Sequence, residues 1–205
     1  MMRLRISAVL LALLAVCGVC PVSAQEMVVS EYYNIQFVEA EWSEFLVVQD
    51  NFNAVGYMIS DANTDQTVRQ GGPQFRDVPL WRNLRAGTII VLWHRALPAT
   101  ATIDTNAADG YLELSSIDQR FFNTLLFPGG VDGMNMADAG DLVHIMRPDT
   151  SNVHMLGHDK PTGPIYDNAT GPKVNFDSGA VGAGRSNRVT GRTLAAYSMG
   201  ITKDS

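Results

Sequence analysis

Three glutamates near the start of the chain are the residues best placed for proton transfer. Glu31, Glu41 and Glu44 flank short apolar runs. Paired carboxylates can act as general acid and base, or can bind a cation. More often, such residues accept hydrogen bonds from backbone amides or arginines at strand edges. Three arginines are available for that second role: Arg82, Arg85 and Arg95. We favour the second role and assign no catalytic residue.

The histidines offer a second kind of chemistry, which is zinc binding. A zinc site needs three or four ligands from His, Cys or carboxylate side chains. The four candidates are His94, His144, His154 and His158. The spacing of His154 and His158 would suit a helix, but Gly157 and the surrounding hairpin pattern argue against one. The sequence therefore predicts no zinc site.

Calcium is the better supported metal, because carboxylate and amide oxygens cluster twice. Asp61, Asn63 and Asp65 form the D-x-N-x-D start of a calcium loop, but Gln66 and Gly72 stand where that loop needs Gly and Glu. A second acidic group comprises Asp132, Asn135, Asp138 and Asp141. The alternative is that both groups are polar turns in which Asp and Asn bind their own backbone. We assign no metal ligand and no cofactor.

Nucleophilic and phosphate-binding motifs are weak in this chain. No G-x-S-x-G pattern occurs, and the Gly-rich run at 179–184 lacks the Lys and Ser/Thr of a phosphate loop. Asn168-Ala169-Thr170 is a glycosylation sequon, which has meaning only in a eukaryotic secretory route.

Aromatic side chains could instead stack on sugars. The candidates are Tyr32, Tyr33, Trp81 and Trp93. Large aromatic residues are more often core residues, and we favour the core for Trp42 and Trp93. A carbohydrate-binding module nevertheless stays open as an interpretation.

The N-terminus predicts export. Arg3 and Arg5 precede an apolar stretch over 6–19, and Ser23-Ala24 supplies a small-residue cleavage site. We therefore expect residues 1–24 to be a signal peptide cut after Ala24. The Cys17-x-x-Cys20 pair lies inside this segment, so it does not indicate a redox site.

Composition bounds the remaining possibilities. The chain has 205 residues and a net charge of −6. Removing residues 1–24 removes both cysteines, two arginines and no acid, which leaves no disulfide and a charge of −8. An acidic chain is a poor match for nucleic acid, so no nucleic-acid partner is expected. No further apolar run is long enough to span a membrane, so no transmembrane segment is expected in the mature chain.

Short β-type runs separated by turn signals must position these side chains. We expect strands at 27–33, 42–49, 55–60, 88–94, 111–114, 142–146, 153–156, 174–176 and 193–199. Arg147 to Asn152 is predicted to be a hairpin turn. A capping-box pattern at Ser116 and Gln119 predicts one short helical turn. The pattern predicts an all-β sandwich of one domain over 25–205, with its core at about 27–160 and with long loops.

Several of these runs, in this order, resemble the lamin-tail domain family. The resemblance is carried by VVSEYYN at 28–34, EWSEFLVV at 41–48, GYMISD at 56–61, NLRAGTIIV at 83–91 and GDLVHI at 140–145. Together with the strand after residue 152, the matching runs cover about 28–158. The resemblance implies an immunoglobulin-like β-sandwich.

The same resemblance implies a role without catalysis. In bacteria such domains look like extracellular modules, and in nuclear lamins the domain is an interaction surface; this is an analogy of fold. We therefore expect an exported binding or structural module, secreted or at the cell surface, with an extracellular protein or glycan as partner. The alternatives are an exported carboxylate- or metal-dependent hydrolase and a carbohydrate-binding module.

Overall fold

The computed structural model describes residues 25–34, 41–127, 133–137, 140–158, 163–176 and 185–188. Several sequence predictions lie outside these residues. They are the signal peptide at 1–24, the Gly-rich run at 179–184, the strand at 193–199, and the acids Asp132 and Asp138.

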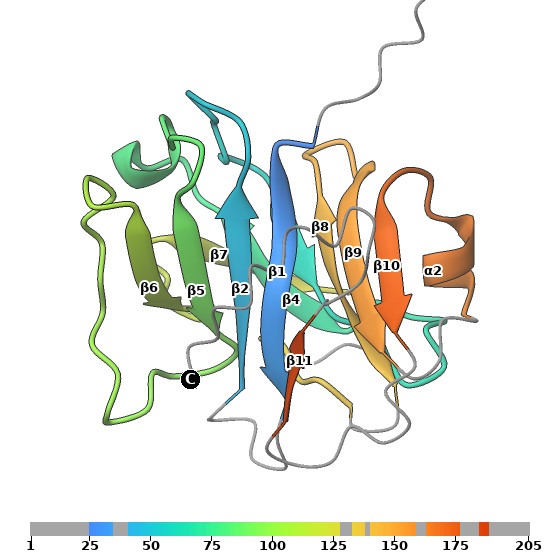
Figure 1. The fold of residues 1–205 in the computed structure, drawn as a ribbon. Coiled ribbons are helices and arrows are strands. Elements are labelled where there is room, and N and C mark those ends of the chain that lie inside the picture. Colours follow the sequence, from blue (N-terminus) through green and yellow to red (C-terminus); the bar gives the residue numbers. More distant parts are fainter. Residues whose placement is uncertain are drawn as a thin grey trace, which may run out of the picture.

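The described residues form two β-sheets that face each other (Figure 1). The first sheet has the order β11-β1-β2-β5-β6, in which only the pair β5–β6 is parallel. Its strands are β1 (Met27–Asn34), β2 (Trp42–Val47), β5 (Ile89–Trp93), β6 (Tyr111–Ser115) and β11 (Arg185–Arg188). The predicted all-β sandwich is confirmed.

The second sheet has the order β10-β9-β8-β3-β4-β7, in which only β9–β10 is parallel. Its strands are β3 (Met58–Ser60), β4 (Gly71–Phe75), β7 (Phe122–Leu126), β8 (Asp141–Met146), β9 (Asn152–His158) and β10 (Lys173–Phe176). Two short helices complete the described fold: the 3-10 turn η3 (Pro79–Trp81) and helix α2 (Pro164–Asn168). Among the described residues, no helix is long and apolar enough to cross a bilayer.

Apolar side chains from both inner faces fill the space between the sheets. Fully buried members include Phe45 and Leu92 of the first sheet, Ile59 and Ile145 of the second, and Trp81 of η3. A bulge in β1 between Val29 and Glu31 shifts its inward-facing positions by one residue, so that Met27, Val29 and Tyr32 all reach the core.

The structure differs from the predicted elements at β4. No strand is predicted between residues 60 and 88, yet Gly71-Gly72-Pro73 lies within a strand. A Cβ atom on Gly72 would lie 1.9 Å from the Ile59 carbonyl oxygen, so only glycine allows β4 to pass this close to β3. Glycine therefore marks close packing here.

The short helical segments also lie away from the predicted position. Residues 116–119 form a turn, because Ser116 Oγ donates to the His94 carbonyl at 2.6 Å and does not cap a helix. Helix α2 forms at Pro164–Asn168, where the sequence pattern predicts no helix, and it has a proline at its first position.

Candidate functional site

The three candidate glutamates do not meet in one cleft. Successive strand residues point to opposite faces, so Glu41 and Glu44 lie on opposite sides of β2. Glu44 pairs in register with Glu31 and accepts a hydrogen bond from Ser30 Oγ at 2.7 Å. Burial raises the pKa of Glu44, and this hydrogen bond lowers it. The arginine partners expected for the glutamates do not include Arg82, which pairs with Asp77 at 2.7 Å.

Glu41 joins Ser43 and His94 in a row that resembles a hydrolase triad. His94 Nδ1 lies 3.3 Å from Glu41 Oε2, and His94 Nε2 lies 2.8 Å from Ser43 Oγ. With Nδ1–H donating to the carboxylate, Nε2 is left to accept from the serine hydroxyl. The order serine, histidine, acid is that of a Ser-His-acid nucleophile. Sequence analysis missed it, because the three residues follow no local motif.

This row is closed to solvent in the structure. The exposed fractions of Ser43, His94 and Glu41 are 0%, 0% and 2%. Glu41 Oε2 also accepts a hydrogen bond from the Met136 amide at 3.2 Å. A nucleophile must reach its substrate, and in the conformation described these three side chains have almost no exposed surface.

Met136 belongs to a segment, residues 133–137, whose amides are bound by buried carboxylates. The Asn135 amide donates to Asp61 Oδ2 and the Ala137 amide to Asp141 Oδ2, each at 2.7 Å. Together with the Met136 amide on Glu41, three consecutive amides therefore donate to three different acids. We call Glu41, Asp61, Asp141 and this segment the acid clamp.

The two aspartates of the acid clamp are held away from water. Burial raises the pKa of Asp61 to about 7, against the opposing effect of its hydrogen bonds from the Asn135 and Gly71 amides. Burial, followed by the neighbouring charge of Asp61, raises the pKa of Asp141 well above its usual value. Burial thus favours the protonated form of the two carboxyl groups, and the amide hydrogen bonds favour the ionised form.

In the structure, members of both predicted calcium groups accept hydrogen bonds from backbone amides. Asp61 binds the backbone as described, and Asn63 Oδ1 accepts from the amides of Thr67 and Val68 at 2.8 and 2.9 Å. These are the capping bonds of a polar turn. Gln66 adopts a φ of +51°, which is the left-handed conformation for which a calcium loop uses glycine. Among the described residues, no three His, Cys, Asp or Glu side chains are grouped as metal ligands.

The remaining strand histidines also have structural partners. His158 Nε2 lies 3.1 Å from the Ala137 carbonyl oxygen, which can only accept, so Nε2 carries the proton and Nδ1 accepts from the Tyr32 hydroxyl. His154 Nδ1 accepts from the Val29 amide at 3.2 Å, and burial lowers its pKa to about 4. His154 and His158 lie on β9, so they do not form the helical pair of a zinc site.

The aromatic candidates divide between the core and one shallow hollow. Tyr32, Trp42 and Trp81 are buried, as is most of Trp93. Trp42 and Trp93 form a small cluster apart from the main core, so they are buried as expected but not between the sheets.

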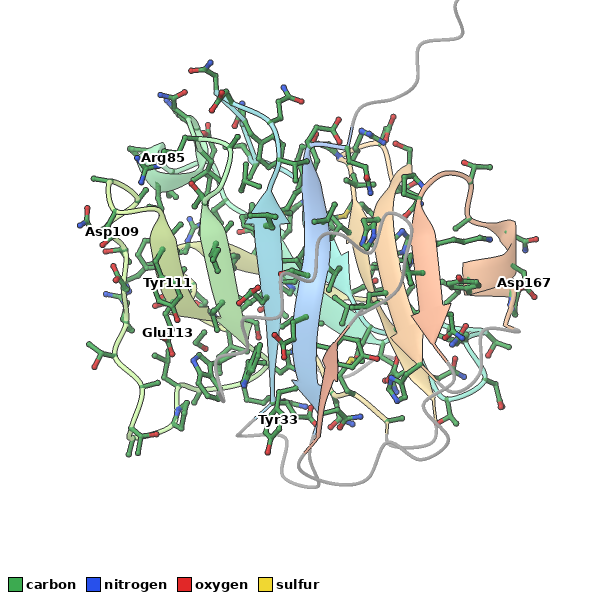
Figure 2. The ribbon with its side chains drawn as sticks, in the orientation of Figure 1. Tyr33, Arg85, Asp109, Tyr111, Glu113 and Asp167 are labelled. Carbon is green, nitrogen blue, oxygen red and sulfur yellow. The ribbon has the colours of Figure 1, made fainter. Side chains whose placement is uncertain are left out.

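The hollow of about 810 Å³ lies beside β6, where Figure 2 labels Tyr111 and Glu113. Both carboxylate oxygens of Glu113 are occupied, one by Trp93 Nε1 at 2.8 Å and the other by the Tyr111 hydroxyl at 2.9 Å. Glu113 thus has donors on both oxygens and is poorly placed to act as an acid or base.

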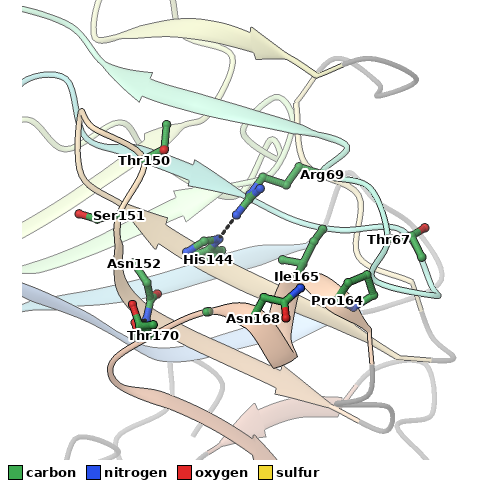
Figure 3. A pocket seen from close by; sticks show the side chains of 11 residues that line it. Thr67, Arg69, His144, Thr150, Ser151, Asn152, Pro164, Ile165, Asn168 and Thr170 are labelled. Atoms are coloured by element: carbon green, nitrogen blue, oxygen red, sulfur yellow. Dashed lines mark hydrogen bonds between the residues drawn. The ribbon is translucent and has the colours of Figure 1, made fainter.

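A second pocket of about 350 Å³ has a different character (Figure 3). It lies on the outer face of the second sheet, between the loop after β3, the β8–β9 hairpin and helix α2. The Ile165 amide donates to the Gln66 carbonyl at 3.1 Å, which ties α2 to the loop. A Cβ atom on Gly163 would lie 2.2 Å from Gln66 Cβ, so glycine permits this contact. We call this cavity the Arg69 pocket.

Arg69 is the charged group of this pocket, and sequence analysis did not select it. Burial lowers the pKa of its guanidinium, and no described carboxylate lies within ion-pair distance. Its Nε atom is buried and makes no hydrogen bond in the structure. Buried polar atoms are usually satisfied, so an exception of this kind points to a missing partner.

His144 forms the base of the Arg69 pocket. An Arg69 terminal nitrogen lies 3.5 Å from His144 Nδ1, and since guanidinium only donates, Nδ1 must accept. Burial, followed by the charge of Arg69, lowers the pKa of His144 to about 3, while the Asn152 side chain acts in the opposite direction. His144 is therefore neutral at physiological pH.

The rest of the Arg69 pocket is lined by the apolar residues Pro164, Ile165 and Ala169 and by six small polar residues. The polar residues are Thr67, Thr150, Ser151, Asn152, Asn168 and Thr170. The predicted sequon Asn168-Ala169-Thr170 lies at this pocket, and Asn168 is exposed. The pocket combines one uncompensated cation with several hydroxyl and amide groups, and it contains no acid that could transfer a proton.

Comparisons of the chain with protein-family models, with curated proteins and with solved structures find no match. The resemblance to lamin-tail domains therefore stays a prediction.

Proposed function

We propose that this protein is an exported, non-catalytic β-sandwich module that binds an extracellular partner, protein or glycan, through the Arg69 pocket. The observation that carries the proposal is the open pocket lined by polar groups, in which the buried Nε atom of Arg69 makes no hydrogen bond and no described carboxylate pairs with the guanidinium. Binding groups without a proton-transfer pair suit recognition better than catalysis.

Two sequence features support the extracellular setting of this proposal. The first 24 residues have the order of a signal peptide, and the strand motifs resemble the lamin-tail family. Export is tested by expressing the full chain in a secreting host and sequencing the N-terminus of the recovered protein. A new N-terminus at Gln25 is the expected result, and retention of residues 1–24 would contradict export by this route.

The binding role is tested by filling the pocket. Asn168 lines the pocket and is exposed, so we expect Asn168→Trp to fold normally and to obstruct the cavity. Wild-type protein and variant are compared for retention on cell-envelope protein and glycan fractions. We expect Asn168→Trp to lose retention.

Asp167→Trp is the matched control. Asp167 is an exposed residue of the same short helix, but it does not line the pocket (Figure 2). This variant should bind as the wild type does. Equal retention of all three proteins would overturn the proposed use of the pocket.

A second candidate function, a hydrolase, is favoured only by the row of Ser43, His94 and Glu41. If this row catalyses, Ser43 must react with a fluorophosphonate probe, which labels activated serines. We expect no labelling, because Ser43 is fully buried. Labelling of the wild type that Ser43→Ala abolishes would establish the hydrolase instead.

A further inference from the structure

We propose that the Arg69 pocket recognises an acidic sugar, with the guanidinium of Arg69 binding the sugar's carboxylate or phosphate group. This inference rests on the proposed binding function and names the ligand class of the same site. The two anionic groups share one chemistry, because each offers oxygen atoms that match the planar donor array of arginine.

The first argument is charge. Taking a cation out of water is unfavourable unless a partner compensates it. In the described part of the chain, the only side chain that Arg69 bonds is His144, a neutral acceptor at 3.5 Å. Elsewhere in the structure a partly buried arginine, Arg147, holds Glu26 at 2.9 Å. An anionic ligand would give Arg69 the kind of partner that Arg147 has.

The second argument is geometry. The bond to His144 engages a terminal nitrogen, while Nε is buried and makes no hydrogen bond. His144 cannot act as a second cation, because burial and Arg69 keep it neutral. The histidine thus positions the guanidinium without competing for the anion, and it engages only one of the two terminal nitrogens.

The third argument concerns the rest of the ligand. The hydroxyl-bearing residues Thr67, Thr150, Ser151 and Thr170 line the walls, together with Asn168 (Figure 3). The Thr67 and Ser151 hydroxyls also bond Asn63 and Asp149. Hydroxyls and amides both donate and accept, which suits a ligand with many hydroxyl groups. The volume of about 350 Å³ lies at the small end of the range for ligand sites, so it suits a single sugar unit.

Isothermal titration of the full chain tests the inference with three probes. The probes are glucuronate, glucose 1-phosphate and the neutral methyl glucoside. We expect at least one of the charged sugars to bind roughly tenfold or more tightly than methyl glucoside. The tighter of the two charged sugars identifies carboxylate or phosphate as the natural group.

Arg69→Gln is the decisive variant. It should weaken binding of the charged sugar by roughly tenfold or more and leave binding of methyl glucoside unchanged. Arg85→Gln is its control, because Arg85 is an exposed arginine on the other side of the molecule from α2 (Figure 2). Thermal melting of both variants establishes that they are folded.

Equal affinity for charged and neutral sugars, or no effect of Arg69→Gln, would overturn the acidic-sugar inference and leave the proposed pocket function standing. Inorganic phosphate binding as tightly as glucose 1-phosphate would overturn the role assigned to the sugar hydroxyls. No binding of either charged sugar at about 10 mM, beyond the weak end of the usual affinity scale, would also overturn it. Failure of the proposed function itself is seen separately, when Asn168→Trp leaves retention on envelope fractions unchanged.

Discussion

The acid clamp and the Arg69 pocket are both polar regions of one small β-sandwich, but they differ in whether their charged groups have hydrogen-bond partners. In the clamp, Glu41, Asp61 and Asp141 each accept backbone amide hydrogen bonds from the segment 133–137 or its neighbours. In the pocket, Arg69 retains a buried Nε without a hydrogen bond. The clamp is closed and satisfied, whereas the pocket is open and unsatisfied.

This difference separates structural from functional polar groups. A buried carboxylate whose oxygens are occupied stabilises the segment it holds, and removing it leaves unpaired donors behind. A charged side chain without a partner adds little to the free energy of unfolding. A ligand of opposite charge can form the missing ion pair, and that interaction then contributes to the free energy of binding. The variants below change one region at a time, so that the two roles can be told apart by the sign and size of the effect.

The largest effect is expected from Asp141→Asn in the clamp. Asp141 is fully buried, and its two oxygens accept from the amides of Ala62, Ala137 and Leu142. An amide nitrogen in place of one oxygen would set a donor against a donor. We expect the free energy of unfolding to fall by about 2–4 kcal/mol, measured by urea denaturation.

Asp65→Asn is the control for that measurement, because Asp65 is exposed and outside the clamp. Its effect should be within about 0.5 kcal/mol. A loss below about 1 kcal/mol for Asp141→Asn would show that the clamp does not hold the fold.

The next effect is a pH dependence of opposite sign in the two regions. The pKa of Asp61 is raised to about 7, so in the acid range the folded protein keeps a proton that the unfolded chain releases. Asp61 therefore stabilises the fold at low pH and loses that contribution as pH rises toward 7. The pKa of His144 is lowered to about 3, so below its usual value of 6.5 the unfolded chain takes up a proton that the fold excludes. His144 thus reduces stability as pH falls.

Removing either Asp61 or His144 should change how the free energy of unfolding depends on pH, in opposite directions. Between about pH 7 and pH 5, Asp61→Asn should lose about 1–2 kcal/mol more stability than the wild type loses, because the stabilising contribution of Asp61 is gone while the opposing contributions of His144 and His154 remain. His144→Gln should lose less stability than the wild type loses over the same pH range. Urea denaturation at several pH values measures both, and parallel curves for the two variants would contradict the opposite signs.

Strand positions could be read from the sequence far better than these partnerships. The apolar runs of β1, β2, β5, β8 and β9 were found because alternation and β-branched residues are local signals. The strand β4 was missed, because Gly72 is required by a contact with Ile59 that no local pattern reveals.

The candidate sites show the same limit. Asp61 and Asp141 were selected by residue type, but they were placed in two separate metal groups, whereas the structure brings both onto one segment. Arg69 was not selected at all. Its importance lies in the absence of a nearby carboxylate among the described residues, and that is a property of the folded chain alone.

A smaller effect is expected from Ser43→Ala. Removing the hydroxyl leaves His94 Nε2 without its partner at 2.8 Å, in a site with no access to solvent. We expect a loss of about 1–2 kcal/mol in the free energy of unfolding. Thr102→Ala, at an exposed position, should change it by less than about 0.5 kcal/mol. An unchanged free energy of unfolding for Ser43→Ala would show that the Ser43–His94 hydrogen bond does not stabilise the fold.

The smallest effect, and the only one expected to have the opposite sign, comes from Arg69→Met. Methionine keeps an unbranched apolar side chain and removes the uncompensated charge, so the free energy of unfolding should stay the same or rise by up to about 1 kcal/mol. Arg147→Met is the contrasting variant. It removes the ion pair with Glu26, whose atoms lie 2.9 Å apart, so the free energy of unfolding should fall by about 1 kcal/mol. Ligand-free urea denaturation compares the two. If Arg69→Met cost as much as Arg147→Met, the Arg69 guanidinium would be a structural group like those of the clamp. A gain or no change would mean that the fold holds Arg69 for a partner that arrives from outside.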